Sequence, residues 1–254
     1  MDITALKLQP AKINQFKKKG IETIEQLIDF VPRKYLDYRN PKLRSQFVDG
    51  ENISTIVRIV SCDFNAMKGY WKAVVEDDAY DRFDIYWFGN VYGVNQITRG
   101  ERYIFCGKVS YTWYNKKWQM SNPMFSKDID SLKTIIPVYS KINGMSDAYL
   151  KGCINKVLNA FVPDEILEWE IIDKYNLCCA AEKLRYIHQP QTPEDIEIAK
   201  KRMVFDELFH LAIEMERTYR ETRCPTDITI KTCNWWRNWI LHLFHWFSKC
   251  RNHR

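Results

Sequence analysis

Glycine is scarce in this sequence, with nine residues in a chain of 254. The phosphate-binding loop of P-loop ATPases has the pattern G-x-x-x-x-G-K-[ST], in which backbone N–H groups bind phosphate and the last hydroxyl binds magnesium. The nearest approach runs from Gly100 to Gly107, Lys108 and Val109, where the spacing is too long and valine replaces the hydroxyl. We therefore expect no cofactor in this chain, neither ATP nor magnesium.

Long apolar runs are also absent, since none reaches the roughly 18 residues that a membrane-spanning helix needs. The N-terminal sequence MDITALKLQPAK has no basic stretch followed by an apolar one, so it does not match a secretory signal. We expect a cytoplasmic protein with no place in a membrane.

Cysteines number eight, but they are dispersed along the chain rather than grouped. In a cytoplasmic protein this distribution is typical of reduced thiols. We predict free thiols at Cys62, Cys106, Cys153, Cys178, Cys179, Cys224, Cys233 and Cys250.

No set of residues typical of nucleophilic catalysis is recognisable, neither a Ser-His-Asp triad nor a Cys-His pair. His188 and His210 lie in helical segments, where we expect packing roles. Acidic pairs at 164–165 and 206–207 superficially resemble metal ligands, but helix capping and a solvated helix face explain them. The expectation is a chain with no catalytic residues and no metal site.

Positive charge is unevenly placed along the chain. The formal net charge is +6, with +4 in residues 1–50, +1 in residues 51–126, −4 in residues 127–217 and +5 in residues 218–254. Nearly all of the excess lies at the two ends. Such a distribution does not by itself identify a nucleic-acid partner.

The N-terminal region shows helical spacing. A stretch from Ala5 ends at Gly20, a residue that commonly stops a helix, and a second stretch begins at Ile21. Apolar residues recur at helical spacing until Pro32 closes the pattern. We predict a small helical hairpin.

From Asn52 the apolar pattern changes from helical to alternating. Runs rich in Val, Ile, Tyr, Phe and Trp are typical of half-buried strands, and a hairpin with Asn115-Lys116 at its turn follows them. About five short strands suit a closed barrel of the oligonucleotide-binding (OB) type. An immunoglobulin-like sandwich needs more strands and a Cys, Trp, Cys spacing. The runs are ISTIVRIVSCD, YWKAVVED, RFDIYWF and RYIFCGKV.

Beyond Pro123 the sequence returns to helices. One more extended segment lies at 134–139, and Ser146 is a suitable cap for the helix after it. Pro163 is expected to open a helical stretch through Tyr175. A long helix starts at 192–195, where Thr-Pro-Glu-Asp supplies a cap, an N1 proline and acidic first-turn residues. Its apolar face is predicted to carry Ile198, Arg202, Phe205, Leu208, Phe209, Ala212 and Met215.

Several motifs occur in collinear order. They are Val-Pro-Arg-Lys-Tyr-x-Asp-x-Arg at 31–39, a Trp-Phe strand and loop leading to Gly-Lys-Val at 87–109, Pro-Val-Tyr at 137–139, and Ile-His-x-Pro with Arg-x-x-Phe-x-Glu-Leu at 187–208. Together they resemble the bacterial RecG family of branched-DNA helicases, in the part that precedes the motor. The resemblance covers about residues 10–217.

The resemblance implies an OB-fold wedge domain that meets a replication fork and separates nascent from template strands, while a downstream motor hydrolyses ATP. It also implies that two aromatic residues after the Trp-Phe strand stack on bases at the branch point. Phe88 and Tyr92 occupy those positions. An exposed ring can replace a neighbouring base for about 1 to 3 kcal/mol, whatever the base sequence. The alternative is that Phe88 is the last core-facing residue of its strand.

Two positions depart from the family pattern. The family's Phe-Asn pair is Phe-Gly-Asn at 88–90 here, which affects how the loop is aimed. Residues 8–10 are Leu-Gln-Pro where related sequences often have glycines, so a backbone cradle for phosphate is not supported there. Lys17–Lys19 can reach a DNA backbone, but a charge run of this kind is usually a solvated helix face.

Basic residues lie beside aromatic ones throughout the barrel segment. This combination suits a binder that is indifferent to base sequence, because the charges meet phosphates and the rings meet bases. We predict phosphate contacts from Lys68, Lys72, Arg99, Arg102, Lys108, Lys116 and Lys117. Lys116 lies in the predicted turn and Lys117 follows it, and both are expected to be exposed. The interleaved aromatic residues, about half of them expected in the core, are Tyr70, Trp71, Tyr111, Trp113, Tyr114 and Trp118.

The composition shifts abruptly beyond about Thr218. Four of the nine tryptophans, three of the eight cysteines and three of the five histidines lie in residues 218–254. The resemblance stops near Arg220, where a related helicase continues toward its motor. Our hypothesis is a gene truncated before the motor, with a tail translated out of frame or from unrelated sequence.

This tail has two possible functional interpretations and one in which it has no function. Its Cys and His residues at 233–253 resemble zinc ligands, but their spacing fits no compact zinc finger. Aromatic and basic residues at 236–251 resemble an amphipathic helix that lies on a membrane. We favour an apolar tail that packs loosely or aggregates.

We predict an α+β protein with a helical region in residues 1–50, an OB-fold wedge domain in 51–127, a helical linker in 128–217 and an atypical tail in 218–254. The predicted function is the DNA-binding wedge part of a RecG-like helicase at stalled forks and recombination junctions. The alternative is a protein-interaction module or a nonfunctional remnant. The expected partner is branched DNA, and the apolar face of the long helix favours self-association.

Overall fold

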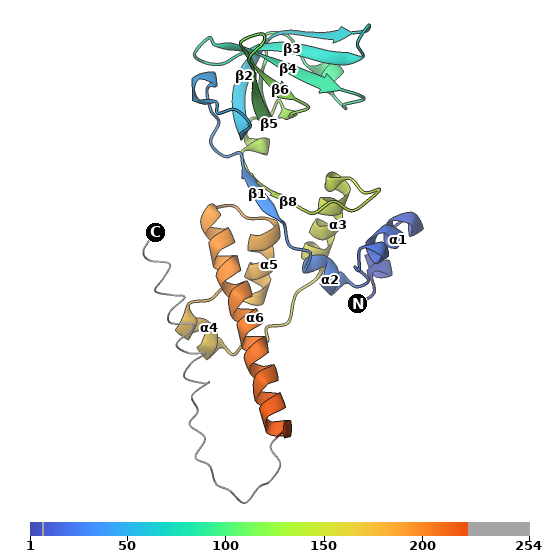
Figure 1. Ribbon diagram of the computed structural model, residues 1–254, viewed down its shortest axis with the longest axis vertical. Coiled ribbons are helices and arrows are strands. Elements are labelled where there is room, and N and C mark those ends of the chain that lie inside the picture. Colours follow the sequence, from blue (N-terminus) through green and yellow to red (C-terminus); the bar gives the residue numbers. More distant parts are fainter. Residues whose placement is uncertain (7, 223–254) are drawn as a thin grey trace, which may run out of the picture. The chain divides into compact units, whose positions relative to one another are not determined.

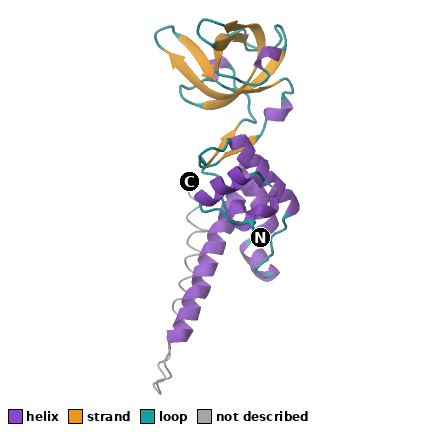
Figure 2. Cartoon of the chain, turned by 90° about the vertical axis from the view of Figure 1, so that its right-hand side faces the viewer, coloured by secondary structure: helices purple, strands orange, loops and turns teal. Residues whose placement is uncertain are grey.

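The computed structural model describes residues 1–6 and 8–222, which divide into two compact units. The first unit, Met1–Ala199, contains a β-barrel and a group of helices (Figures 1 and 2). The second unit begins at Lys200 and, within the described residues, is the remainder of the last helix. The candidate zinc ligands and amphipathic helix of the tail lie outside the described residues.

The barrel is a closed ring of five strands in the order β2-β3-β4-β6-β5, completed by pairing between β2 and β5. Within this ring β4 and β6 run parallel, and the other neighbours run antiparallel. This is the OB-type barrel that the alternating pattern predicts. The strands are β2 (Asn52–Asn65), β3 (Tyr70–Glu76), β4 (Arg82–Phe88), β5 (Arg102–Thr112) and β6 (Lys117–Ser121), and a short β7 (Met124–Ser126) is added to β5.

The barrel interior is filled by one face of each strand, because successive side chains alternate across a strand. Trp87 is fully buried there, and its indole N–H donates to the Pro123 carbonyl at 3.3 Å. Gly107 lies against the same proline, since a Cβ on Gly107 would lie 3.2 Å from Pro123 Cα. A larger side chain at Gly107 therefore requires the chain to move.

The N-terminal helices are shorter than the sequence pattern indicates. Helix α1 (Pro10–Lys18) ends before Gly20, whose φ of +82° confirms the predicted stop. Helix α2 (Ile24–Ile28) begins later than expected because Thr23 caps it. The Thr23 hydroxyl accepts the N–H of Gln26, and the Gln26 side chain accepts the N–H of Thr23.

Two short strands join segments that are far apart in the sequence. Strand β1 (Lys34–Asp37) pairs antiparallel with β8 (Ile135–Val138), which is the extended segment expected after the barrel. The pairing of β1 was not predicted. Short 3-10 turns complete the chain at η1 (Ile3–Leu6), η2 (Arg44–Gln46), η3 (Val94–Gln96) and η4 (Asp130–Leu132).

Helices follow β8, and one of them differs from the prediction. Helix α3 (Asp147–Ala160) begins at the predicted cap, Ser146. The helix expected from Pro163 is absent up to residue 168, and α4 spans only Trp169–Tyr175. The physical reason lies at Glu165, whose carboxylate accepts the N–H of Ala180 at 2.7 Å and so caps the next helix, α5 (Ala180–His188).

Helix α6 (Pro193–Thr222) starts as predicted. The Thr192 hydroxyl accepts the N–H of Asp195, and the Asp195 carboxylate accepts the N–H of Thr192. Its predicted apolar face is only partly buried. Phe205 is buried, whereas Met215 is exposed.

The described cysteines are all reduced thiols: Cys62, Cys106, Cys153, Cys178 and Cys179. The prediction is confirmed for these five, and the other three cysteines lie in the tail outside the described residues. Across the described chain, no helix combines the length and the hydropathy that crossing a bilayer requires.

Candidate nucleic-acid interface

The hairpin of β2 and β3 extends past the rest of the barrel. Strand β5 pairs with β2 only as far as Arg58, so the last residues of β2 pair with β3 alone. Phe64 and Trp71 face each other across this extension, with ring centroids 5.3 Å apart. Trp71 lies on the same face of β3 as the buried Ala73, because alternate residues share a face. Both rings therefore lie on the face that continues the barrel interior.

Phe88, a predicted base-stacking residue, ends β4 and is 51% exposed. It points away from the barrel core, so the alternative of a core-facing Phe88 is wrong; the adjacent Trp87 has that role. The Phe88 ring contacts Tyr70 and Tyr86, at centroid distances of 5.7 and 6.3 Å. Its backbone N–H donates to Asn122 Oδ1 at 2.7 Å, which fixes where the strand ends.

Tyr92, the second predicted base-stacking residue, is 94% exposed in the loop after β4. Gly89 and Gly93 bracket this loop with φ of +76° and +82°, in the left-handed region that glycine adopts without strain. No ring contact joins Tyr92 to Phe88 in the described chain. The structure thus places the two rings near one end of the barrel but does not stack them on each other.

The predicted phosphate contacts fall into two groups. Lys72 forms an ion pair with Asp84 at 3.0 Å and lies over the Tyr86 ring, and Arg102 pairs with Asp78 at 2.8 Å. Burial by itself lowers the pKa of Lys72, because it disfavours the charged form. The hydrogen bond and the charge of the Asp84 carboxylate have a larger effect together, so the pKa of Lys72 is raised above its ordinary value. The other five are exposed and make no ion pair with described residues: Lys68, Arg99, Lys108, Lys116 and Lys117.

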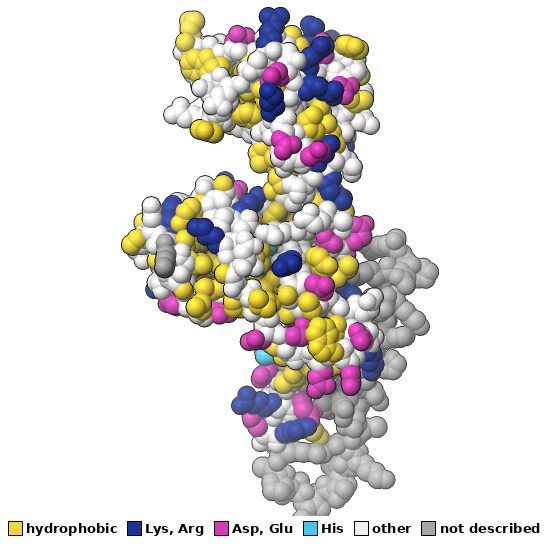
Figure 3. All heavy atoms as spheres, turned by 180° about the vertical axis from the view of Figure 1, so that it is seen from behind, with side chains coloured by type: hydrophobic (Ala, Val, Ile, Leu, Met, Phe, Trp, Pro, Cys, Tyr) yellow, Lys and Arg dark blue, Asp and Glu magenta, His cyan; other side chains and the backbone are white. Residues whose placement is uncertain are grey.

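These basic residues do not form one surface. Lys68 lies in the turn of the β2–β3 hairpin, two residues before Tyr70, which pairs with Phe88. Lys117 begins β6, which runs parallel to β4 with Gln119 beside Asp84, so Lys117 lies toward the opposite end of β4 from Phe88. Figure 3 shows Lys and Arg side chains gathered over part of one barrel face, beside projecting hydrophobic side chains.

The hairpin of β5 and β6 carries a second set of exposed rings. Trp113 and Tyr114 are 79% and 95% exposed, and the turn occupies residues 113–116 rather than Asn115-Lys116 alone. Lys116 and Lys117 are exposed as predicted. The remaining interleaved rings are partly buried, namely Tyr70, Trp71, Tyr111 and Trp118.

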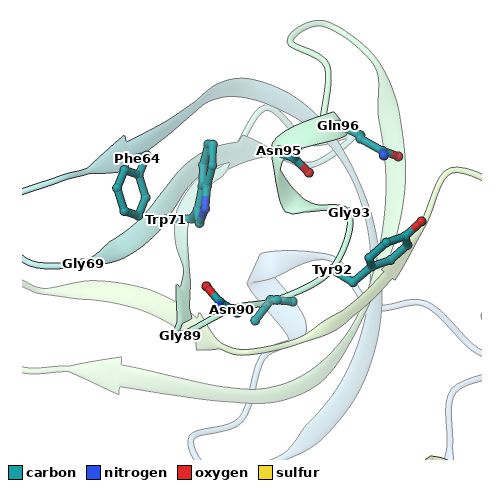
Figure 4. Close-up of a pocket in the computed structure, with 10 residues that line it drawn as sticks. Phe64, Gly69, Trp71, Gly89, Asn90, Tyr92, Gly93, Asn95 and Gln96 are labelled. Atoms are coloured by element: carbon teal, nitrogen blue, oxygen red, sulfur yellow. The ribbon is translucent and has the colours of Figure 1, made fainter.

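A pocket of about 600 Å³ lies between the β2–β3 hairpin and the loop after β4 (Figure 4). None of its lining residues carries a charge. Asn90 and Asn95 supply polar groups, and Trp71 and Phe64 supply aromatic ones. The lining residues are Phe64, Gly69, Trp71, Gly89, Asn90, Val91, Tyr92, Gly93, Asn95 and Gln96.

The motif at 31–39 has a structural role. The Tyr35 hydroxyl donates to the Ile187 carbonyl at 2.8 Å, and burial raises the pKa of Tyr35 to about 12. The Arg39 guanidinium donates two hydrogen bonds to the Asp37 carboxylate, of 3.0 and 2.8 Å, and the Arg39 backbone N–H donates a third of 3.0 Å. Tyr35 therefore ties β1 to the end of α5, where the Ile-His-x-Pro motif lies.

The two histidines outside the tail differ. His188 is buried and bonded to Tyr139 and to the Ile28 carbonyl, as a packing role predicts. Burial lowers the pKa of His188 to about 4. His210 is exposed on α6, so the packing role expected for it is wrong.

Acidic residues give no metal site within the described part of the chain, where no group of three or more His, Cys, Asp or Glu side chains is placed to hold an ion. Glu165 caps α5 instead, and Asp206 accepts a hydrogen bond from Arg202 at 2.7 Å. Lys17–Lys19 are exposed at the end of α1.

The aromatic wall of the pocket was only partly found from the sequence. Trp71 was named among the interleaved rings, but Phe64 and the asparagines were not. The length of β2 explains the aromatic wall. Strand β2 has 14 residues and its partner β5 has 11, so β2 extends past β5 and leaves the rings at its end exposed. That length becomes visible only once the strand pairing is known.

Comparisons with known proteins cover most of this chain. The family model described as the RecG wedge domain matches residues 5–161. The ATP-dependent DNA helicase RecG of Thermotoga maritima is 25% identical over 223 residues, covering 84% of this chain and 28% of the relative. RecG of Synechocystis sp. is 24% identical over 228 residues, covering 81% of this chain and 27% of the relative.

A solved structure, of RecG bound to a three-way DNA junction, resembles this chain with a TM-score of 0.75 and 24% sequence identity. The match covers 87% of this chain and 31% of that one. At this identity the likeness shows a shared fold. The chain spans less than a third of the length of these relatives.

Proposed function

Because the chain belongs to the RecG wedge domain family, we propose that it binds branched DNA at forks and junctions and holds the strands apart where they diverge. Exposed rings at one end of the barrel take the place of stacked bases, and exposed lysines and arginines contact the phosphates. In this proposal the chain acts by binding DNA, and its sequence holds no phosphate loop.

One observation carries this proposal: Tyr92 projects from a loop between two left-handed glycines and is 94% exposed. Phe88 lies at the end of the preceding strand, half-exposed and supported by Tyr70 and Tyr86. Rings held out in this way suit stacking on unpaired bases. The similar fold of a RecG that is bound to a three-way DNA junction supports the same partner here.

Base sequence is not expected to matter. A ring can stack on any base, and phosphates are identical at every position. Five exposed basic residues of the barrel have no ion-pair partner in the described chain, so their charge is available for DNA. Binding should therefore weaken steeply as salt concentration rises, because phosphate contacts release counterions.

The test compares the full chain on a fork and on a linear duplex of the same base composition, over a salt series. We expect tighter binding to the fork and a steep salt dependence for both. Replacing Phe88 and Tyr92 with alanine should reduce the fork preference, whereas Trp169→Ala, at an exposed ring of α4 outside the barrel, should leave it unchanged. Equal and salt-insensitive binding of fork and duplex by the wild type contradicts the proposal.

A further inference from the structure

The pocket between the β2–β3 hairpin and the loop after β4 has one aromatic wall and one polar wall. In Figure 4 the Trp71 indole is seen edge-on, with one face turned to the hollow and Phe64 behind it. Asn95 lies across from this face, and Asn90 lies below the Trp71 ring. A flat ligand that enters the hollow therefore meets a ring on one side and amides at its edge.

The polar wall has unused hydrogen-bonding capacity. Asn90 and Asn95 are exposed, and their side chains make no hydrogen bond within the described chain. Each amide offers both donors and an acceptor. Gly89 leaves the approach open, since a Cβ built on it would meet no atom within 4 Å.

The absence of charge among the lining residues limits what the pocket can hold. A phosphate or a metal ion buried there would have no counter-charge, which is costly. A neutral, planar ring with polar atoms at its edge matches both walls, and 600 Å³ lies within the range of small-molecule sites, about 300 to 1,000 Å³. A nucleobase has this chemistry.

Resting on the proposed function, we propose that this pocket takes one unpaired nucleobase of a DNA strand, stacked on Trp71 with its polar edge toward Asn90 and Asn95. Lys68 supports the proposal from the pocket rim. It precedes the lining residue Gly69, is exposed and has no ion pair in the described chain, so it suits the phosphate next to the bound base.

The pocket is separate from the surface of Phe88. Tyr70 and Trp71 are neighbours on β3 and so point to opposite faces of the hairpin. Phe88 packs on Tyr70, whereas the pocket is built on Trp71. A base in the pocket is thus a different base from one stacked on Phe88.

The experiment uses the full chain and forks that carry 2-aminopurine at each unpaired position near the branch in turn. Stacking on an indole quenches this base, so one position should lose fluorescence when the wild type binds. Trp71→Leu keeps an apolar side chain but removes the ring, and it should abolish the quenching and weaken fork binding about tenfold, since stacking supplies that order of free energy. Trp169→Leu, at an exposed tryptophan of α4, is the matched control and should change neither.

An abasic site at the quenched position adds a second measurement. It should weaken binding by the wild type about tenfold and have no further effect on Trp71→Leu, because the two changes remove the same contact. Asn90→Ala with Asn95→Ala alters only exposed side chains, so it should fold normally and weaken binding about threefold. This double variant keeps the test valid if Trp71→Leu fails to fold.

The outcomes separate the pocket from the function on which it rests. If the wild type prefers forks but no position is quenched, or if quenching survives Trp71→Leu and is lost in Tyr92→Ala, the pocket proposal is wrong and the proposed function stands. If the wild type does not bind forks, both are wrong.

Discussion

His188 donates a hydrogen bond from Nε2 to the main-chain carbonyl of Ile28, at 2.7 Å. A carbonyl can only accept, so Nε2 carries the proton, and Nδ1 accepts from the Tyr139 hydroxyl at 2.8 Å. The neutral imidazole therefore satisfies both partners. A second proton would compete with the hydroxyl for Nδ1 and place a charge in a buried site.

Stability should fall as the pH drops below the ordinary pKa of histidine. Burial holds the pKa of His188 at about 4 in the folded chain, against 6.5 in the unfolded chain. The unfolded state thus binds the proton first, and the stabilising contribution present above pH 6.5 is lost progressively down to about pH 4. Between pH 7.5 and 5.5 the loss is about 1 kcal/mol. Urea unfolding at the two pH values measures it.

The control for this pH effect is His188→Gln, whose amide can keep a hydrogen bond without titrating. It should lower stability at pH 7.5 but reduce the difference between the two pH values. An unchanged pH dependence in His188→Gln would assign the effect to other groups.

The Tyr35 hydroxyl should contribute measurably to stability, because it satisfies the Ile187 carbonyl across a large sequence separation. We expect Tyr35→Phe to lower the free energy of unfolding by about 1 to 2 kcal/mol. Tyr114→Phe removes a hydroxyl from an exposed ring and should change it by less than about 0.5 kcal/mol. Urea midpoints of the two variants give the comparison, and equal midpoints would rule out the role of Tyr35.

Alanine substitutions at two glycines should change the stability of the fold in opposite directions. Gly144 has a φ of +75°, and a Cβ on it would clash with the side-chain nitrogen of Gln15. Gly144→Ala should therefore cost about 1 to 2 kcal/mol. Gly152 lies inside α3 with no atom within 4 Å of a built Cβ, so Gly152→Ala should stabilise by up to about 1 kcal/mol. Thermal unfolding of both variants tests the sign, and a shift in the same direction contradicts this account.

Lys68 and Lys72 should differ in DNA binding although they are near neighbours. Lys68 has no ion pair in the described chain, so Lys68→Ala should weaken fork binding and reduce the slope of log K against log salt by about 1. Lys72 is already paired with the buried Asp84, so Lys72→Met should change the slope less and cost about 1 to 3 kcal/mol of stability. Titrations at four salt concentrations, with unfolding curves, distinguish them. Equal slopes for the two variants would show that the ion pair does not matter.

Self-association through α6 is expected. Leu211 and Met215 are four residues apart on this helix and are both exposed. Sedimentation over a hundredfold range of concentration should show an apparent mass that rises with concentration, and Leu211→Lys with Met215→Lys should lower it. A constant monomer mass for the wild type contradicts the expectation.

The barrel strands were predictable because their apolar residues alternate, and helix starts were predictable where local side chains cap them, as at Ser146 and Thr192. Two of the differences from the prediction depended on distant partners. Strand β1 is short and pairs with β8, far along the chain. The stretch after Pro163 is not helical because Glu165 bonds to Ala180 instead.

The candidate site shows the same division. Exposure of Tyr92 and Lys116 follows from their positions in a loop and a turn, and Lys117 is the first residue after that turn. The ion pair of Lys72 does not, because it depends on Asp84 of the next strand. The pocket was not predictable from the sequence either, because its walls come from the β2–β3 hairpin and from the loop after β4, which meet only in the folded barrel.

The pairing of β1 with β8 also has a topological meaning. Asp37 stands opposite Ile135, so the chain leaves for the barrel and returns from it at neighbouring points. The barrel is thus the loop of one large hairpin whose stem is β1 and β8. We expect a short linker between residues 39 and 134 to close the remaining chain if the barrel is removed, because the stem already holds these two ends close together, with the Tyr38 N–H donating to the Thr134 carbonyl at 3.1 Å.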